Sequence, residues 1–226
     1  MKKVLLFASI AALLAACTPK PKFELDVNIR NNNSLMNKKF VVTQKIGGAV
    51  VYSDTMKIKK DQLLLNIPYK GTALMAVSIP ESNINDIMMV AEEGQIQLNI
   101  DGVKTSMGGT PLNDRLQAFY LGNDSVSALF QQLEKDRSAF SSQPVPAKLT
   151  PKMEEELKQK RGEFLQRRTQ LLNENTDRII AFIKENIDNP IGEYYFMTTY
   201  ITLPLDRKLE LNNFATEKLK RESGIK

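Results

Sequence analysis

The chain has 226 residues and a formal net charge of +5, and it contains no histidine and no tryptophan. Histidine is the usual general base near neutral pH and a common metal ligand, so its absence excludes Ser-His-Asp and Cys-His catalysis and most zinc sites. A single cysteine excludes Cys-x-x-Cys redox chemistry. Neither half of the chain concentrates the positive charge that nucleic-acid binding requires.

The N-terminus has the layout of a secretory signal peptide, because two lysines precede an uncharged apolar stretch that ends at residue 16. This stretch is too short to cross a bilayer as a helix, which needs about 20 residues. The segment LLAAC at 13–17 resembles the lipobox of bacterial lipoproteins. We therefore predict a lipoprotein signal peptide over residues 1–16 and lipidation of Cys17. The alternative is an ordinary signal peptide with an incidental cysteine.

Residues 17–22 are predicted to form a short tether. Two prolines favour an extended polyproline conformation that spans roughly 16 Å, which would hold the folded part close to a membrane. By resemblance to bacterial sorting rules, Thr18 in place of an aspartate disfavours retention in the inner membrane, and the tether lacks an acidic surface-export run. We expect an outer-membrane lipoprotein that faces the periplasm and carries no cofactor beyond the lipid on Cys17.

An antiparallel β domain is predicted over residues 23–107. Residues 23–29 alternate apolar and polar side chains, the period of a half-buried strand. Gly47-Gly48 is a hairpin signal, and Asp101-Gly102 is predicted to connect strands. Seven short strands with no helix between them indicate a β-sandwich-like fold or an open barrel. The six further strands are predicted at 40–46, 50–58, 63–67, 73–79, 87–90 and 96–100.

A helical region is predicted over residues 108–226, which makes the fold class α+β. Two glycines permit a turn, Thr110 can cap a helix, and Pro111 suits its first position. Apolar residues recur at three- to four-residue spacing over 112–140 and again over 153–187, so two long helices are expected to form an antiparallel pair. Shorter helices are predicted at 191–201 and 205–221.

The second long helix carries a basic run of five residues, Lys158, Lys160, Arg161, Arg167 and Arg168. One interpretation is contact with anionic lipid head groups. Interleaved glutamates at i,i+4 distances favour the other interpretation, a solvated helix face.

Aromatic residues cluster just after Pro190, and Tyr194, Tyr195 and Tyr200 are the candidate binding surface. Tyrosine is enriched in contact surfaces. The alternative is that the cluster docks its helix onto the core while the hydroxyls reach water.

Four short segments lie in this order between residues 50 and 120: Asp54-Thr55, LLLNIP at 63–68, VAEEGQI at 90–96, and GTPLND at 109–114, which opens a helix that contains Phe119. With them, this stretch resembles an uncharacterised domain of Gram-negative envelope lipoproteins, which in many members precedes a thioredoxin-like, peroxiredoxin-related domain. The resemblance implies a β-sandwich-like module with an attached helical part. This chain has no cysteine pair, so the redox activity of the relatives does not carry over.

Three functions follow from these observations. The first is a non-catalytic binding or scaffold module of the envelope, anchored in the membrane and partnered by an unknown envelope protein or small ligand, with no role for nucleic acid. The second, which rests on the resemblance, is an accessory partner of a separate thiol-disulfide or peroxide system. The third is a carboxylate-dependent hydrolase. Glu92, Glu93 and Asp101 lie near predicted strand ends, where turn chemistry also explains them.

Overall fold

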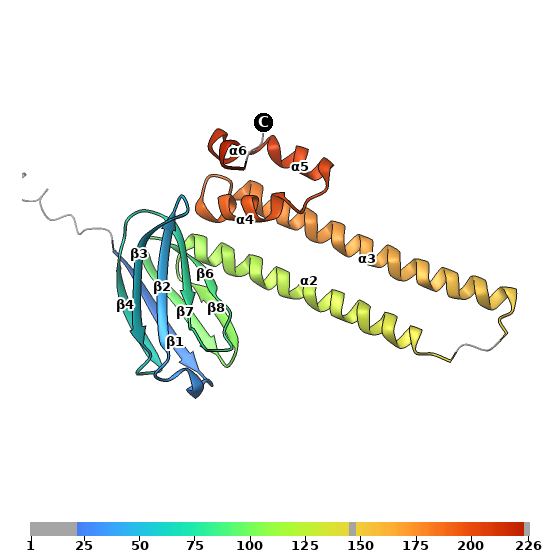
Figure 1. The fold of residues 1–226 in the computed structure, drawn as a ribbon, viewed down its shortest axis with the longest axis horizontal. Coiled ribbons are helices and arrows are strands. Elements are labelled where there is room, and N and C mark those ends of the chain that lie inside the picture. The colour runs from blue at the N-terminus through green and yellow to red at the C-terminus, as the bar shows by residue number, and fades with distance from the viewer. Residues whose placement is uncertain (1–21, 145–147, 224–226) are drawn as a thin grey trace, which may run out of the picture.

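Eight strands precede five α-helices in the part of the chain that the computed structural model describes, residues 22–144 and 148–223 (Figure 1). The strands and one short 3-10 helix are β1 (Lys22–Arg30), η1 (Asn33–Leu35), β2 (Lys39–Ile46), β3 (Ala49–Lys57), β4 (Gln62–Pro68), β5 (Ala73–Ser78), β6 (Ile87–Ala91), β7 (Gly94–Asp101) and β8 (Lys104–Gly108). The helices are α2 (Pro111–Ser141), α3 (Pro151–Glu185), α4 (Pro190–Tyr200), α5 (Leu205–Asn212) and α6 (Glu217–Ser223). The predicted α+β class, with a β-sandwich-like start followed by helices, is confirmed.

The strands form two four-stranded sheets, ordered β4-β1-β7-β8 and β3-β2-β5-β6. All neighbouring strands are antiparallel except β1 and β7, which pair in parallel. The sequence analysis did not predict this parallel pair, and it also missed β8. The predicted connection at Asp101-Gly102 is the turn between β7 and β8, since Asp101 pairs with Lys104.

One row of apolar side chains from each sheet fills the space between the two sheets. Phe23 of β1 and Phe40 of β2 are both fully buried there, and burying a large apolar side chain stabilises a fold by about 1.5–3 kcal/mol. The same core continues into the helices through Leu116, Phe119 and Phe182. The roots of α2 and α3 and the sandwich therefore share one core.

The start of α2 is bonded to the turn between β6 and β7. Glu92 Oε2 accepts a hydrogen bond from the backbone N–H of Leu112 at 2.9 Å, so this carboxylate satisfies a helix-start donor. Thr110, the predicted cap, makes no capping bond to the backbone; its hydroxyl accepts a bond from Asn113 instead. The buried Asn113 amide also accepts from the N–H of Val90 at 2.9 Å and donates to its carbonyl at 2.8 Å. Asn113 thereby pairs with β6 as a neighbouring strand would.

The predicted antiparallel helix pair is confirmed as the hairpin of α2 and α3, which extends well beyond the sandwich (Figure 1). At 1.5 Å per residue, its helices are about 46 and 52 Å long. The single helix predicted at 205–221 is wrong in one respect, because it is two helices, α5 and α6. The chain bends between them where the N–H groups of Phe214 and Ala215 both donate to Leu211. Buried Leu211, Ala215 and Leu219 then pack in a second, smaller core.

Candidate functional site

A tight turn between α3 and α4 fixes α4 against the outer face of the second sheet. Asn189 Oδ1 accepts hydrogen bonds from the N–H groups of Ile191 and Gly192 and so caps α4, with Pro190 in its first position. A Cβ on Gly192 would lie 1.8 Å from the carbonyl oxygen of Asn186. Only glycine allows this close approach, which brings α4 back towards β5.

A groove of about 800 Å³ lies between α4 and this sheet, and we call it the sandwich groove. Its floor and walls combine the outward side chains of Leu74, Ala76 and Met88 with Tyr194 and Met197 of α4. Its remaining lining comes from β2, the β2–β3 turn, the start of β5, the α3–α4 turn and the start of α4, namely Thr43, Lys45, Ile46, Gly47, Gly48, Thr72, Ala73, Asp188, Asn189, Pro190 and Glu193. This volume lies within the range of about 300–1,000 Å³ that small-molecule sites occupy.

The chemistry of the sandwich groove is apolar inside and charged at its border. Leu74, Ala76 and Met88 are half-buried on the sheet, and two thioether side chains allow the walls to adapt in shape. Lys45 and Asp188 are exposed and bring opposite charges to the same groove. The arrangement suits a ligand with an apolar body and polar ends, or apolar side chains of a partner.

The β2–β3 turn forms one lip of the groove. Gly47 and Gly48 have φ angles of +55° and +81°, as a two-residue hairpin turn with two left-handed residues requires. The hairpin predicted at these two glycines is confirmed.

The three predicted tyrosines lie in different surroundings, although the rings of Tyr194 and Tyr195 meet edge-on at 5.3 Å. Tyr194 lines the sandwich groove. Tyr195 lies in the aromatic junction, which we define as Phe119, Phe182 and Tyr195; its ring meets those of Phe119 and Phe182 edge-on at 4.9 and 5.5 Å. Tyr200 stacks on Phe196 at 5.2 Å, in the second core. Only Tyr194 therefore contributes to the candidate site.

Burial of the aromatic junction also changes its acid–base chemistry. Desolvation raises the pKa of the Tyr195 phenol far above its usual value, and it raises the pKa of Tyr120, which shares a side-chain hydrogen bond with Tyr195. Both phenols stay protonated at neutral pH. The guanidinium of Arg178 lies 4.8 Å from the Phe119 ring centre and donates to the Phe119 carbonyl, which joins α3 to α2. These contacts hold α2, α3 and α4 together, so the aromatic junction has a structural role.

The predicted carboxylates occupy separate places. Glu92 caps α2, as described above, and Asp101 accepts a hydrogen bond from Asn31 at 2.7 Å. Glu93 is exposed beside the β6–β7 turn. Within residues 22–144 and 148–223, no group of three or more acidic, cysteine or histidine side chains is placed to hold a metal ion.

Two of the four segments on which the family resemblance was based, residues 90–96 and 109–114, lie in contact. A Cβ on Gly109 would lie 2.4 Å from the carbonyl oxygen of Gln95, and one on Gly94 would lie 3.3 Å from Thr110. Together with the Glu92 cap, these contacts dock α2 onto the sandwich. The two segments therefore have a structural role in this chain.

Sequence reasoning missed the sheet side of the sandwich groove. The signal was present, because β5 (ALMAVS) and β6 (IMMVA) are apolar on both faces, whereas β7 (GQIQLNID) alternates strictly. Strands with two apolar faces are covered on both sides. The helix that covers the outer face of β5 is α4, which borders the groove.

Comparisons with known proteins add no relative: no family model, no curated protein and no solved structure matches the chain. The predicted signal peptide, Cys17 and most of the tether lie outside the described residues. None of the helices in the described ranges combines the length and apolar composition needed to span a membrane.

Proposed function

We propose that the protein is a lipid-anchored protein of the bacterial envelope, a non-catalytic binding or scaffold module whose ligand occupies the sandwich groove. The observation that carries the proposal is the groove itself, with its apolar walls from β5, β6 and α4 and its charged border. The lack of histidine in the sequence supports binding over the common forms of acid–base catalysis.

The anchor of the proposed module is a lipid on Cys17. The lipobox-like segment before this residue supports the assignment, as does its position only five residues ahead of β1. An extended tether of this length places the sandwich within roughly 16 Å of the membrane surface. The composition of the tether supports an outer-membrane lipoprotein that faces the periplasm.

The ligand of the sandwich groove is an envelope molecule or partner segment with an apolar body. Leu74, Ala76 and Met88 supply apolar surface, and the hydroxyl of Tyr194 supplies a polar group beside it. Lys45 and Asp188 at the border select for polar or zwitterionic ends over a purely hydrocarbon ligand.

A groove-filling substitution tests the binding proposal. Ala76→Phe places an aromatic ring in the groove, and Asn99→Phe places the same ring on the exposed outer face of the other sheet as a control. The full-length protein, extracted from membranes in mild detergent, is examined by native mass spectrometry and by thermal shift with lysophospholipids, envelope glycans and short apolar peptides. We expect a ligand that binds the wild type and Asn99→Phe but not Ala76→Phe. Equal binding by all three proteins, or no saturable ligand, would contradict the proposal.

The anchor is tested separately. Cys17→Ser should remove fatty-acid incorporation and release the protein from the membrane fraction, while leaving ligand binding by the soluble chain unchanged. Continued membrane fractionation with fatty-acid labelling would overturn the anchor without affecting the groove.

A further inference from the structure

The distal half of the hairpin lacks a core of its own. Beyond Phe119, the only buried side chain of α2 is Leu133, and α3 has none before Ile180. The hairpin nevertheless reaches far from the sandwich (Figure 1). Most helical stability in proteins comes from packing an apolar face against other elements. Because no third helix among the described residues packs along the distal part of α2 and α3, apolar surface stays exposed there and can bind a partner.

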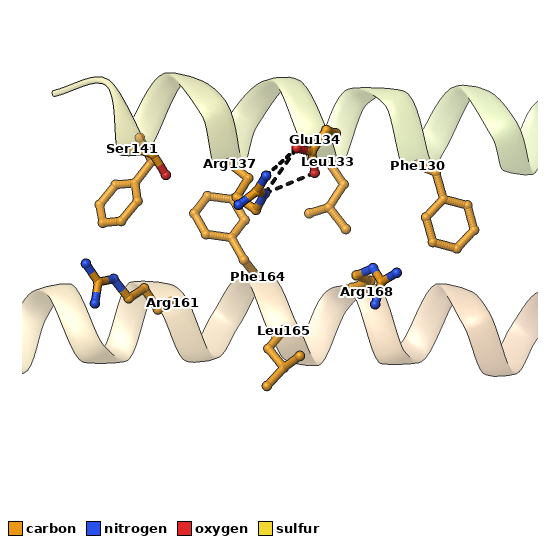
Figure 2. A pocket seen from close by; sticks show the side chains of 10 residues that line it. Phe130, Leu133, Glu134, Arg137, Ser141, Arg161, Phe164, Leu165 and Arg168 are labelled. Atoms are coloured by element: carbon orange, nitrogen blue, oxygen red, sulfur yellow. Dashed lines mark hydrogen bonds and ion pairs between the residues drawn. The ribbon is translucent and has the colours of Figure 1, made fainter.

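A groove of about 550 Å³ lies along the seam between the two helices near their distal ends, and we call it the tip groove. Phe130, Leu133 and Phe140 from α2 and Phe164 from α3 provide its apolar side chains, and the rings of Phe140 and Phe164 lie 5.7 Å apart. Figure 2 shows Phe130, Leu133 and Phe164 between the two helices. The α2 side of the groove extends over residues 130–141, about 17 Å or three helical turns.

Cations border the apolar side chains. Arg137 is paired with Glu134 on its own helix, and this pairing lowers the pKa of the Glu134 carboxyl. Arg161 and Arg168 project from α3 into the groove lining (Figure 2), and neither forms an ion pair with any described residue. Glu163, one of the interleaved glutamates, pairs with Lys160, which lies outside the groove lining. Arg168 also helps to lower the pKa of Glu134, so its charge is partly balanced. The lining still holds three arginines against one glutamate and therefore carries an excess of positive charge.

The net positive charge of the chain after residue 16 comes entirely from this part of the molecule. Residues 130–168 hold nine basic and six acidic residues, a net charge of +3. The rest of the chain after residue 16 holds 20 of each, so its net charge is zero. A partner that binds here gains from carrying negative charge.

Two exposed leucines continue the surface along α3. Leu165 is 65% exposed and Leu172 is 43% exposed, and they are seven residues apart. Residues at this spacing share one face of a helix, as in the seam of a coiled coil. Leu165 also lines the tip groove, so an added helix that lies along the seam can contact the leucine row and the groove together.

We propose that the tip groove docks an acidic amphipathic helix of another envelope protein, which completes a three-helix bundle with α2 and α3. The partner's apolar stripe packs on Phe140 and Phe164, and its carboxylates face Arg161 and Arg168. A second copy of this chain would bring two positive tips together, which charge repulsion opposes. A flat anionic membrane surface would engage the outward lysines of α3 and leave the recessed phenylalanines uncovered.

Designed peptides test this proposal. The probe is a helical peptide of about 21 residues, three heptads with leucine at the seam positions and glutamate at the flanking positions; its counterpart carries lysine at the flanks. Fluorescence anisotropy with the full mature chain, at an ionic strength of about 0.1 M where charges are screened over about 10 Å, measures both affinities. We expect the acidic peptide to bind at least about tenfold more tightly than the basic one.

Charge reversal supplies the matched control. The double variant Arg161→Glu/Arg168→Glu should invert the peptide preference, whereas Lys158→Glu/Arg167→Glu makes the same change of net charge outside the groove lining and should preserve it. All four side chains are exposed, and circular dichroism verifies that both variants fold.

The proposal is overturned if both peptides bind equally, if neither binds saturably, or if the two double variants behave alike. Binding to vesicles of phosphatidylglycerol that both variants lose equally, without any peptide preference, would replace it with membrane contact. Sedimentation that shows a dimer of the free chain, strengthened by Arg161→Glu/Arg168→Glu, would replace it with self-association. None of these results depends on the sandwich groove or on the lipid anchor.

Discussion

The sandwich and the distal hairpin use apolar residues in opposite ways. In the sandwich, rows of side chains such as Phe23 and Phe40 are fully buried between two sheets, and the roots of α2 and α3 join the same core. In the distal hairpin, Leu133 is buried, but Leu165 is 65% exposed. We call the sandwich together with the roots of α2 and α3 the platform, because its apolar side chains are buried in one core. We call the distal hairpin, residues 124–141 and 151–172, the arm, because it leaves apolar surface exposed. The contrast shows that burial of apolar side chains is incomplete in the distal hairpin.

The largest expected loss of stability comes from a substitution in the core of the platform. Phe40→Ala removes a fully buried ring from between the sheets and should lower the free energy of unfolding by about 3–5 kcal/mol, because the truncation leaves a cavity. Chemical denaturation followed by circular dichroism measures the loss. Leu133→Ala is the counterpart in the arm, and there the loss should be at most about 2 kcal/mol, the low end for such truncations. Equal losses would mean that arm and platform are equally well packed.

The next largest loss of stability comes from removing the hydrogen bonds that hold α2 on β6. Asn113→Ala leaves the N–H and the carbonyl of Val90 without the side-chain partner they have now. Each buried backbone group left unpaired costs about 1–3 kcal/mol, so the loss of both partners should lower stability by at least about 2 kcal/mol. Thermal unfolding gives the size of the loss. A loss below about 0.5 kcal/mol would show that Asn113 does not hold α2 on β6.

A substitution at Gln44 should have a smaller effect on stability, and it should increase the stability. Gln44 is fully buried in the sandwich, and neither polar atom of its side chain has a partner among the described residues. Gln44→Met keeps the shape and removes the unpaired groups, so stability should rise by about 1 kcal/mol. Denaturant titration of the variant measures the gain. Destabilisation would show that the amide has a partner that supports the platform.

The smallest effect concerns the arm. The hydrogen bond from Arg137 lowers the pKa of Glu134 from its usual value of 4.5. The favourable contribution of this pair is therefore present above pH 4.5 and is lost as the pH falls through the lowered pKa of the folded state. Wild type and Glu134→Gln should differ slightly in thermal midpoint at pH 7, and this difference should vanish at acidic pH. A difference that persists in acid would contradict this origin.

The sequence predicted which faces of the elements are apolar and which neighbours in the chain pair, such as β2 with β3 and α2 with α3, but not which distant elements meet. Alternation located the first seven strands, whereas β8 (KTSMG) has only Met107 buried and carries no clear period. Pairing of β1 with β7 in parallel depends on long-range packing that no local pattern encodes. For the same reason Tyr194 was a candidate from its aromatic neighbours, while its partners Leu74 and Met88 on the sheet were not.

The basic run of α3 shows the same limit. Counting charges along the helix favoured a solvated face, because glutamates are interleaved with the cations. The rotation of α3 against α2 decides which cations lie beside Phe140 and Phe164, and only the folded structure fixes that rotation. Arg161 and Arg168 lie in the groove lining, whereas Lys158 and Arg167 do not.

Hydrogen exchange of the full-length protein tests the division into platform and arm most directly. We predict that amides in residues 124–141 and 151–172 exchange at least about tenfold faster than those in 113–119 and 180–191, because the distal helices have few buried contacts. Uniform protection along both helices would contradict it, since the arm would then be as tightly held as the sandwich that supports it.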